Sequence, residues 1–471
     1  MAVCRIIWFA IQRYFRYNGP MDNIQQKLGK MGIEIPEILL PQKMNLQQWA
    51  VIACDQFTQD RVYWEKVREA ATGQPSTLNM VLPEVFLADD DHAKRIEDIH
   101  RTMRDYVAGS VFAAPRRGLV YLERDTPFNC GRRGLVAAVD LEQYDWSPQA
   151  RSLIRSTEDT VPDRLPPRME IRRDAPIETP HILLLIDDDG DSLLRGLGEQ
   201  AKKNAPAYQG SLMLNSGSVS GWFLDAPENW DFLAGGLEEL LHRSLTRYGD
   251  GGQPFLFAVG DGNHSLASAK GIWEEYKAKN AAANGDLPVH PCRYALVEIE
   301  NVYDPAIQFE PIHRVVFGLG FNETLRLLSA LPGFSSQIIP TGEDLVRLTA
   351  ESAKGSRFGI ISGNRYALVT TSAEGIATVS LQPLLDQAIG GLDGNNNGLS
   401  IDYIHGEDEL FRLASGSGTA GGPVTGILLP PVQKYGFFET VARCGPLPRK
   451  SFSMGEAWEK RFYIECRKLF G

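Results

Sequence analysis

The spacing of hydrophobic positions predicts an alternation of helices and short strands over the first part of the chain. Ile96, Ile99 and Met103 recur at helical spacing, and Asp89 is placed to cap the helix that we expect over residues 90–107. The other elements expected here are a helix over residues 230–248 and strands over residues 49–53, 119–123, 135–140 and 181–186. Such an alternation is typical of an α/β lobe.

The pattern changes after Pro288. Residues 293–300 read as a strand, and residues 357–381 read as three short apolar strands separated by turns, which predicts a β-meander. The amphipathic spacing of residues 456–470 predicts a terminal helix. We therefore expect a mixed α/β or α+β fold with two lobes.

The length of the chain also indicates two lobes, because 471 residues exceed what one hydrophobic core usually organises. We expect an α/β lobe over residues 31–287 and an α+β lobe over residues 288–471. Residues 1–30 are expected to lie outside the fold. Within them, residues 1–16 are apolar and basic without a small-residue cleavage site, and we interpret them as an extension upstream of a natural start at Met21.

Charge and composition exclude several classes of function. Forty-eight basic and 59 acidic side chains give a net charge of −11, which opposes nucleic acid as the main ligand. Apolar runs are too short for a bilayer span, so we expect no membrane partner. Six cysteines without a C-x-x-C pair favour a reducing cytoplasm over a disulfide scaffold or a zinc ribbon.

The sharpest local signal is a strand, a tight turn and a helix around residues 255–279. The glycines of Gly260-Asp261-Gly262 allow the backbone to approach a ligand closely, and the start of a helix favours an anion such as phosphate. Asp261 could hold Mg²⁺ or accept a proton, and His264 could transfer a proton or stabilise negative charge. The alternative is an ordinary Asp-Gly turn in which Asn263 caps the helix.

Two basic segments are further candidates for binding an anion. Arg155, Arg164 and Arg168 belong to a group of six nearby arginines, and the Thr157 hydroxyl adds a donor, so this loop could wrap a phosphate or a carboxylate. Arg449 and Lys450 lie in a proline-stiffened loop beside two serines. The alternatives are a solvated charged connector for the first segment and a surface turn for the second.

Four motifs together resemble a known family. They are residues 49–58 (WAVIACDQFT), residues 155–158 (RSTE) with the following PPR, residues 260–265 (GDGNHS) and residues 448–451 (PRKS). In this order they resemble the domain-of-unknown-function family DUF1015, from about Gly32 to the C-terminus. The family name implies no settled reaction.

The turn also resembles, more remotely, the nucleotide-binding turn of the ParB and sulfiredoxin superfamily, which includes free-serine kinases. Asp261, Gly262 and His264 match the usual Asp-Gly-His-His-Arg motif, whereas Asn263 replaces its first histidine and Ser265 its arginine. The resemblance therefore implies nucleotide phosphates at this turn, with the missing cationic charge supplied from elsewhere in the chain.

These observations predict a cytoplasmic phosphotransferase or nucleotide hydrolase that uses Mg²⁺ and ATP, ADP or CTP on a small polar metabolite, for which free serine is one candidate. Asp261 is the expected metal ligand or base, and Glu158 or Asp55 the residue that orients the acceptor hydroxyl. The expected phosphate-binding residues are Arg155, Thr157, Arg164, Arg168, Gly262, Asn263, His264, Ser265, Arg449 and Lys450.

Two alternatives belong to other classes. One is a nucleotide-gated binding or regulatory protein without turnover. The other is a nucleotide-independent lyase or isomerase that uses the arginines to recognise a carboxylate metabolite. The oligomeric state and the base of the nucleotide leave no sequence signal.

Overall fold

The computed structural model describes residues 20–248, 253–280, 290–351, 355–373, 375–390, 398–415 and 422–470. The chain divides into two compact units. Unit 1 comprises Met1–Ser156, Thr160–Ile307 and Ala457–Gly471, and unit 2 comprises Thr157–Asp159 and Gln308–Glu456. The last segment of the chain therefore returns to unit 1, which no sequence pattern indicated.

Unit 1 is built on a mixed sheet of ten strands. In spatial order the strands are β10 (Tyr208–Ser211), β11 (Ser218–Leu224), β4 (Leu119–Asp125), β5 (Arg132–Asp140), β13 (Tyr294–Asn301), β9 (Leu183–Ile186), β12 (Phe257–Asp261), β7 (Ile154–Arg155) and β6 (Tyr144–Asp145), and β1 (Ile33–Glu34) pairs with β5. Strand β13 pairs with both β5 and β9, which places the chain up to Ile307 in unit 1 and beyond the boundary expected at residue 288.

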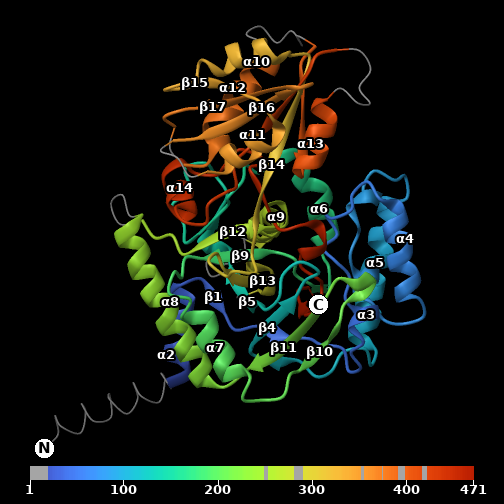
Figure 1. Cartoon of the computed structure of the whole chain (residues 1–471). Helices are drawn as coiled ribbons and strands as arrows, with labels where there is room; N and C mark the ends of the chain where they lie inside the picture. The colour runs from blue at the N-terminus through green and yellow to red at the C-terminus, as the bar shows by residue number, and fades with distance from the viewer. Residues whose placement is uncertain are drawn as a thin grey trace, which may run out of the picture. The chain divides into compact units, whose positions relative to one another are not determined.

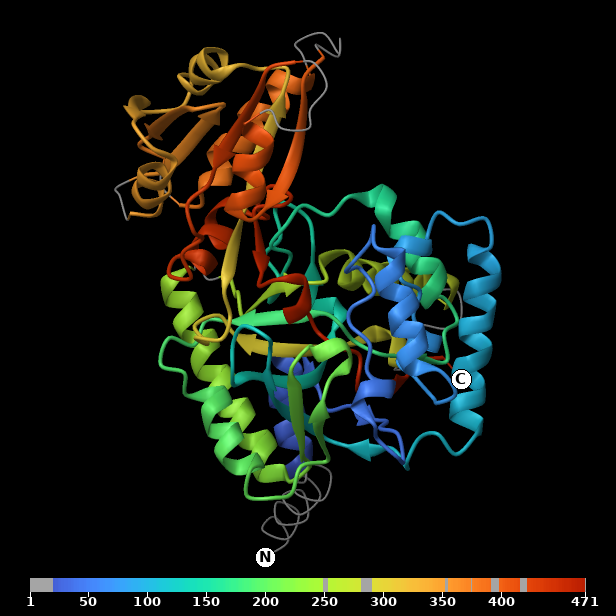
Figure 2. The same ribbon diagram turned by 45° about the vertical axis from the view of Figure 1, so that its right-hand side comes forward.

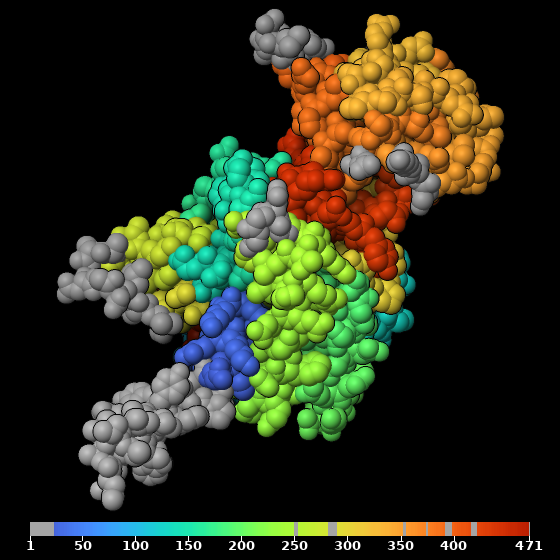
Figure 3. All heavy atoms as spheres, turned by 90° about the vertical axis from the view of Figure 1, so that its left-hand side faces the viewer, coloured from blue at the N-terminus to red at the C-terminus, as the bar shows by residue number. Residues whose placement is uncertain are grey.

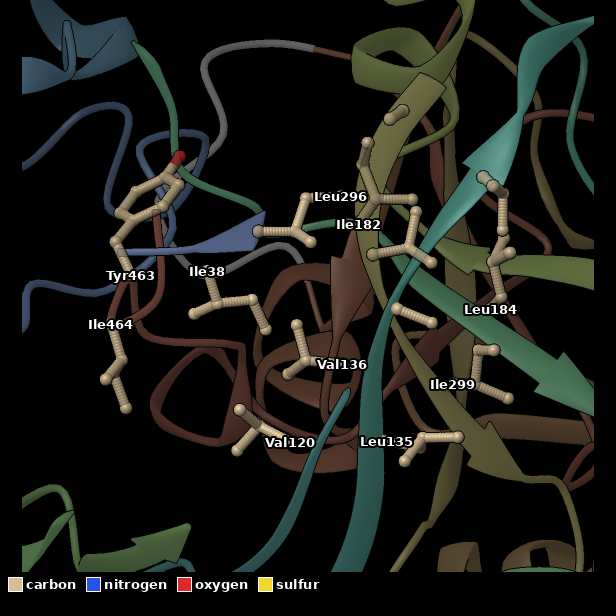
Figure 4. Packing of buried hydrophobic residues seen from close by; sticks show 14 of the residues in the cluster. Ile38, Val120, Leu135, Val136, Ile182, Leu184, Leu296, Ile299, Tyr463 and Ile464 are labelled. Carbon is tan, nitrogen blue, oxygen red and sulfur yellow. The ribbon is translucent and has the colours of Figure 1, made fainter. Parts of the chain in front are cut away.

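Both faces of the central strands are buried. Leu135 and Val136 are adjacent on β5 and fully buried, and their side chains point to opposite sides of the strand (Figure 4). Val120 from β4 and Ile299 from β13 belong to the same core. Near-continuous apolar strands of this kind require layers on both sides of the sheet.

Helices supply those layers (Figures 1 and 2). Helix α7 (Leu193–Ala201) packs on β4 and β5 and against α8 (Pro227–Arg247), and α2 (Pro20–Lys30) packs against α8, as Figure 3 shows. The other helices of unit 1 are α3 (Leu46–Trp49), α4 (Arg61–Ala71), α5 (His92–Ala108), α6 (Leu165–Arg172) and α9 (Asn263–Asn280). Within the described residues, no helix has the length and hydropathy that crossing a bilayer demands.

Helix α2 corrects part of the expectation for the N-terminus. Ile24 and Leu28 are 8% and 1% exposed and join the core of unit 1, so residues 20–30 belong to the fold. The remainder of the predicted extension, residues 1–19, lies outside the described residues.

Unit 2 has a sheet of seven strands with helices packed on it. In spatial order the strands are β15 (Ser335–Ile339), β17 (Arg365–Thr370), β16 (Arg357–Ser362), β19 (Val424–Leu428), β14 (Phe309–Phe317) and β18 (Ser400–His405), and β20 (Phe452–Met454) pairs with β14. The helices are α10 (Phe321–Leu328), α11 (Gly342–Ala350), α12 (Ala377–Gly390), α13 (Glu407–Ala414) and α14 (Phe437–Cys444). The mixed α/β class expected from the sequence is confirmed.

Three predicted elements are wrong. Residues 49–53 follow helix α3 and make only an isolated bridge between Ile52 and Phe462. The third strand of the meander is the start of α12, where Ala377, Leu381 and Leu385 form a buried helical face. The terminal helix is replaced by an extended segment with a short strand, β21 (Arg467–Lys468).

The physical reason for the last error lies in the charged side chains of the segment. Glu459, Arg461 and Glu465 lie within the predicted helix, but they are 4%, 3% and 0% exposed. Glu459 accepts a hydrogen bond from the Thr126 hydroxyl, and Arg461 pairs with Glu298 and Glu465, all inside unit 1. When a segment is buried on every side, no side of it faces solvent. The helical spacing of its hydrophobic residues therefore does not indicate a helix.

Candidate active site

The predicted strand, turn and helix are confirmed. Strand β12 ends at Asp261, Gly262 forms the turn with φ +80°, and α9 begins at Asn263. A Cβ atom at Gly262 would lie 3.1 Å from the Cα of Ile182, so both the backbone angle and the close neighbour require glycine. The Gly262 N–H donates to Asp261 Oδ1 at 2.9 Å, which fixes the carboxylate over the turn.

A lysine from the end of the chain meets this carboxylate. Lys460 Nζ lies 3.2 Å from Asp261 Oδ2, and the two side chains are 8% and 21% exposed. The pair is thus shielded from solvent on the lysine side and accessible on the aspartate side. An ammonium group in such surroundings can form charge-assisted hydrogen bonds with a second anion that enters from the exposed side.

The path of the C-terminal segment explains the position of Lys460. The segment runs antiparallel to residues 51–53: the Ala53 N–H donates to Arg461 O and the Tyr463 N–H donates to Val51 O, both at 2.8 Å. From the sheet, Arg124 donates to the carbonyl groups of Trp458, Glu459 and Lys460. The backbone around Lys460 is therefore fixed on both sides.

The antiparallel contact between residues 51–53 and the C-terminal segment also brings Asp55 within electrostatic reach of Lys460. Burial acts to raise the pKa of Asp55, but the charge of His181, a hydrogen bond from Gln56 and the charge of Lys460 more than offset it, so this pKa lies below its usual value. Asp55 is therefore ionised at neutral pH. Asp55 and Asp261 both interact with Lys460, although they lie far apart in the sequence.

His181 is held by a tyrosine from the C-terminal segment. The Tyr463 hydroxyl lies 2.8 Å from His181 Nδ1 and accepts the Cys54 N–H at 3.2 Å. Burial raises the pKa of Tyr463 well above its usual value, so its hydroxyl keeps its proton at neutral pH. We name the five side chains Asp55, His181, Asp261, Lys460 and Tyr463 the Lys460 centre.

The start of α9 is tied to the segment that follows β7. The Ser156 hydroxyl donates to Asn263 Oδ1 at 2.6 Å, and the Val161 N–H donates to His264 Nε2 at 3.3 Å. In this contact His264 Nε2 acts as a hydrogen-bond acceptor, which leaves Nδ1 as the ring nitrogen that can donate. Residues 261–265 are all half-buried, which leaves this turn partly open to solvent.

A cavity of about 120 Å³ adjoins these residues within unit 1. Three of its lining residues connect it to the Lys460 centre. Tyr463 belongs to the centre and contacts His181, Cys54 donates its N–H to the Tyr463 hydroxyl, and Ser265 lies in the turn that follows Asp261. Most of the remaining wall is apolar and comes from Met80, Leu82, Leu87, Met103, Ile171 and Ile177. Two ion pairs, Glu84–Arg168 and Arg172–Glu178, and the hydroxyl-bearing residues Thr179 and Ser268 also line it.

The three predicted arginines of unit 1 differ in their availability. Arg155 is 4% exposed; its guanidinium donates to the carbonyl groups of Ser152 and Pro254 and stacks on Phe255, at the end of β12 opposite to Asp261. Arg168 is engaged by Glu84, and Arg164 is exposed at the start of α6. Arg155 therefore supports the fold, and we leave it out of the proposed site.

The other predicted residues belong to unit 2. Thr157 is fully buried, and Glu158 pairs in parallel with Leu447. Arg449 lies over the ring of Tyr403, at 5.6 Å, and the exposed Lys450 has a positive φ of 59°. Within that unit a buried arginine, Arg314, also lies over Tyr403 and interacts with the charge of Glu158.

Sequence reasoning missed three members of the Lys460 centre. Lys460 and Tyr463 fall within the predicted terminal helix, and His181 is the first residue of the predicted strand over residues 181–186. For His181 a signal was present, because it lies just before β9. Strand β9 pairs with β12 so that Leu183 is opposite Asp261, which places His181 at the same edge of the sheet as Asp261. For Lys460 and Tyr463 no local signal exists, because only the return of the chain to unit 1 places them there.

The centre does not form a metal site of its own. Both oxygens of Asp261 are engaged, one by the Gly262 N–H and the other by the Lys460 ammonium, whose charge opposes a cation at the same place. Among the residues that the structure describes, no group of three or more His, Cys, Asp or Glu side chains is arranged to hold a metal ion. Any Mg²⁺ here would depend on phosphate oxygens for most of its ligands.

The model of one protein family, described as "Protein of unknown function (DUF1015)", matches residues 37–393. Among solved structures, a free serine kinase in complex with AMP is 14% identical, covers 71% of this chain and 92% of its own, and has a TM-score of 0.33. SbnI from Staphylococcus aureus, with a C-terminal truncation, is 12% identical over 70% of this chain and 86% of its own, with a TM-score of 0.33.

A conserved hypothetical protein from Pyrococcus furiosus is 13% identical over 70% of this chain and 90% of its own, with a TM-score of 0.31. No curated protein matches the chain.

Proposed function

The chain belongs to the DUF1015 family of proteins of unknown function, and from this premise we propose that unit 1 is a nucleotide-dependent phosphotransferase. In the proposed reaction, the terminal phosphoryl group of a nucleotide passes to the hydroxyl group of a small metabolite, for which free serine is one candidate. The observation that carries the proposal is the position of Lys460 between two carboxylates at the glycine turn that opens α9.

The donor arrangement supports phosphate binding. Lys460 supplies a fixed positive charge, and the first turn of α9 lies at the positive end of the helix dipole. Gly262 has no side chain of its own and the turn at residues 261–265 is half-buried, so a ligand can approach the backbone there. Asn263, His264 and Ser265 are proposed to donate or accept hydrogen bonds around the phosphate.

The carboxylates are proposed to act on the acceptor. Asp55 is ionised and lies beside His181, so this pair can orient the acceptor hydroxyl and receive its proton as the new O–P bond forms. The bond between the terminal phosphorus and its bridging oxygen breaks, and the leaving nucleotide keeps the bonding electrons. Lys460 then stabilises negative charge on the transferred group.

Several further assignments stay proposals. Arg164 is the arginine we retain as a phosphate ligand, and Mg²⁺ is proposed to arrive with the nucleotide rather than to reside in the protein. Thr157, Glu158, Arg449 and Lys450 belong to unit 2, and we leave them out of the site proposed for unit 1. ATP, ADP and CTP are the candidate donors, and the cytoplasm is the proposed compartment.

The test is turnover with defined nucleotides. Purified protein is incubated with ATP, ADP or CTP, Mg²⁺ and serine, and mass spectrometry follows the nucleotide and the phosphorylated acceptor. We expect at least one nucleotide to lose its terminal phosphoryl group. Tight binding of a nucleotide without any product would instead support the regulatory alternative, and no response to any nucleotide would overturn the proposal.

A matched pair of variants separates the proposed site from general damage. Lys460→Met removes the charge at the turn, and Lys468→Met removes an exposed lysine from the same C-terminal segment. Loss of turnover in the first variant and its retention in the second is the expected result. Equal turnover in both variants would contradict a role for Lys460.

A further inference from the structure

The size and lining of the cavity beside the Lys460 centre indicate the chemistry of the acceptor. The cavity measures about 120 Å³, and its wall combines apolar side chains with the polar side chains of Cys54, Thr179, Ser265, Ser268 and Tyr463 and with two ion pairs, Glu84–Arg168 and Arg172–Glu178. For comparison, an engineered apolar cavity of about 150 Å³ binds benzene. A cavity of this size and lining suits a small hydrocarbon group better than a charged one.

Three polar side chains of the wall connect the cavity to the residues proposed to do the chemistry. Cys54 is adjacent to Asp55, the Tyr463 hydroxyl contacts His181, and Ser265 lies in the first turn of α9. A molecule in the cavity whose hydroxyl lies beside the Tyr463 hydroxyl would be linked to His181 through that tyrosine. Its hydrocarbon part would meet apolar side chains of the wall such as Leu87 and Met103.

The charged groups of the wall do not change this conclusion. Glu84 and Arg168 neutralise each other as an ion pair, and Arg172 pairs with Glu178 in the same way. Burial raises the pKa of Glu84 above its usual value despite Arg168, which indicates surroundings that disfavour an additional charge. The cavity is therefore unsuited to the carboxylate or ammonium group of a free amino acid.

We propose that the cavity is the acceptor subsite and that the acceptor is a small amphipathic alcohol, with a hydroxyl at one end and a branched hydrocarbon group of about four or five carbons at the other. The inference rests on the proposed phosphotransferase activity for its catalytic part. It deepens that proposal because free serine has no such hydrocarbon group.

The first arm of the test measures binding alone, with 3-methylbutan-1-ol as the probe and ligand-observed NMR as the readout. We expect saturable binding to the wild type. Ala175→Leu adds bulk at the cavity wall and is expected to weaken this binding at least tenfold, whereas Ala150→Leu, at a buried alanine outside the cavity, leaves it unchanged. Absence of binding, or equal loss in both variants, would overturn the proposal.

The second arm measures turnover with a nucleotide and a series of primary alcohols from ethanol to hexan-1-ol, with serine alongside. Burial of one methylene group corresponds to about a fourfold gain, so kcat/KM is expected to rise about fourfold per carbon until the cavity is full. Ile171→Ala enlarges the cavity and is expected to shift the optimum to a longer chain.

The two arms distinguish the two claims. Serine turned over as efficiently as the longer alcohols would overturn the acceptor proposal and leave the phosphotransferase intact. Binding of the alcohol without turnover of any nucleotide would overturn the phosphotransferase and the acceptor role together, and would leave only an apolar cavity.

Discussion

Two adjacent residues of the C-terminal segment, Lys460 and Arg461, form two very different ionic centres in unit 1. Lys460 pairs with Asp261, whose side chain is 21% exposed. Arg461 pairs with Glu298 and Glu465, which are 2% and 0% exposed. The two side chains start from neighbouring positions directly after the short 3-10 helix η7 (Ala457–Glu459) and reach different partners.

The Arg461 centre is closed to solvent. The guanidinium of Arg461 also donates to Pro180 O at 3.0 Å, and Glu465 accepts a hydrogen bond from the Tyr208 hydroxyl. Next to it, Arg132 Nε lies 3.0 Å from Glu300 Oε1 but is not aligned for a hydrogen bond. No ligand can reach these groups without opening the core, so their role is to hold the segment in place.

The Lys460 centre differs in its accessibility. The side chain of Asp261 is 21% exposed and the turn at residues 261–265 is half-buried, so a ligand can approach this pair from solvent. The comparison teaches that charge and burial alone do not identify a site. The closed ionic cluster holds the C-terminal segment in place, whereas the neighbouring open cluster can contact a ligand.

The largest expected effect is on stability and concerns the closed centre. Arg461→Met leaves two buried carboxylates without their cation, and breaking a buried pair in this way costs about 3–5 kcal/mol. Urea denaturation followed by tryptophan fluorescence would measure this loss, and an insoluble variant would agree with it. A variant as stable as the wild type would show that the cluster is not closed.

The next effect concerns the open centre and separates activity from stability. Lys460→Met is expected to lower turnover by about 10²–10³-fold, the usual cost of removing a donor aimed at developing charge. Its free energy of unfolding is expected to fall by only about 1–2 kcal/mol, because Asp261 keeps partial access to water. A loss of stability equal to that of Arg461→Met would erase the distinction between the two centres.

A smaller effect is expected at the turn. Gly262→Ala places a Cβ atom 3.1 Å from the backbone of Ile182 at a φ of +80°, and we expect a destabilisation of about 1–2 kcal/mol. Gly363→Ala, at a glycine of φ +59° with open space around it, is the matched control for the backbone angle alone. Equal losses in both variants would show that the close approach to Ile182 has no cost.

The smallest effect is a pH dependence of the closed centre. Burial raises the pKa of Glu300 to about 8, with Arg132 opposing this and Glu298 adding to it. A raised pKa in the folded state means that this group favours folding most below its ordinary pKa of 4.5, and that this contribution is lost as the pH rises to about 8. Glu300→Gln is expected to remove this slope from urea denaturation curves between pH 5 and pH 8, and an unchanged slope would contradict the assignment.

Much of the fold could be predicted from local patterns. The helices α5, α8 and α9 and the strands β4, β5, β9 and β13 lie where periodicity indicated. Two of the three errors share one cause. Residues 49–53 and 461–464 come from opposite ends of the chain, pack against each other and are buried, so neither shows the alternation that exposes one face to solvent.

The candidate site could be predicted only in part for the same reason. Asp261 and Asp55 follow recognisable signals, the glycine turn and the polar end of an apolar run. Arg155 looked equally promising, yet its guanidinium is used by two backbone carbonyls at the far end of β12. Lys460 became visible only when the end of the chain was placed beside Asp55.

The central claim is that Lys460 binds the phosphate groups of a nucleotide at the turn before α9. Isothermal titration of ADP with Mg²⁺ into the wild type, Lys460→Met and Lys468→Met at one salt concentration tests it most directly. We predict binding to the wild type and to Lys468→Met, and at least tenfold weaker binding to Lys460→Met. Equal affinity of all three proteins, or no binding to the wild type, would contradict the claim.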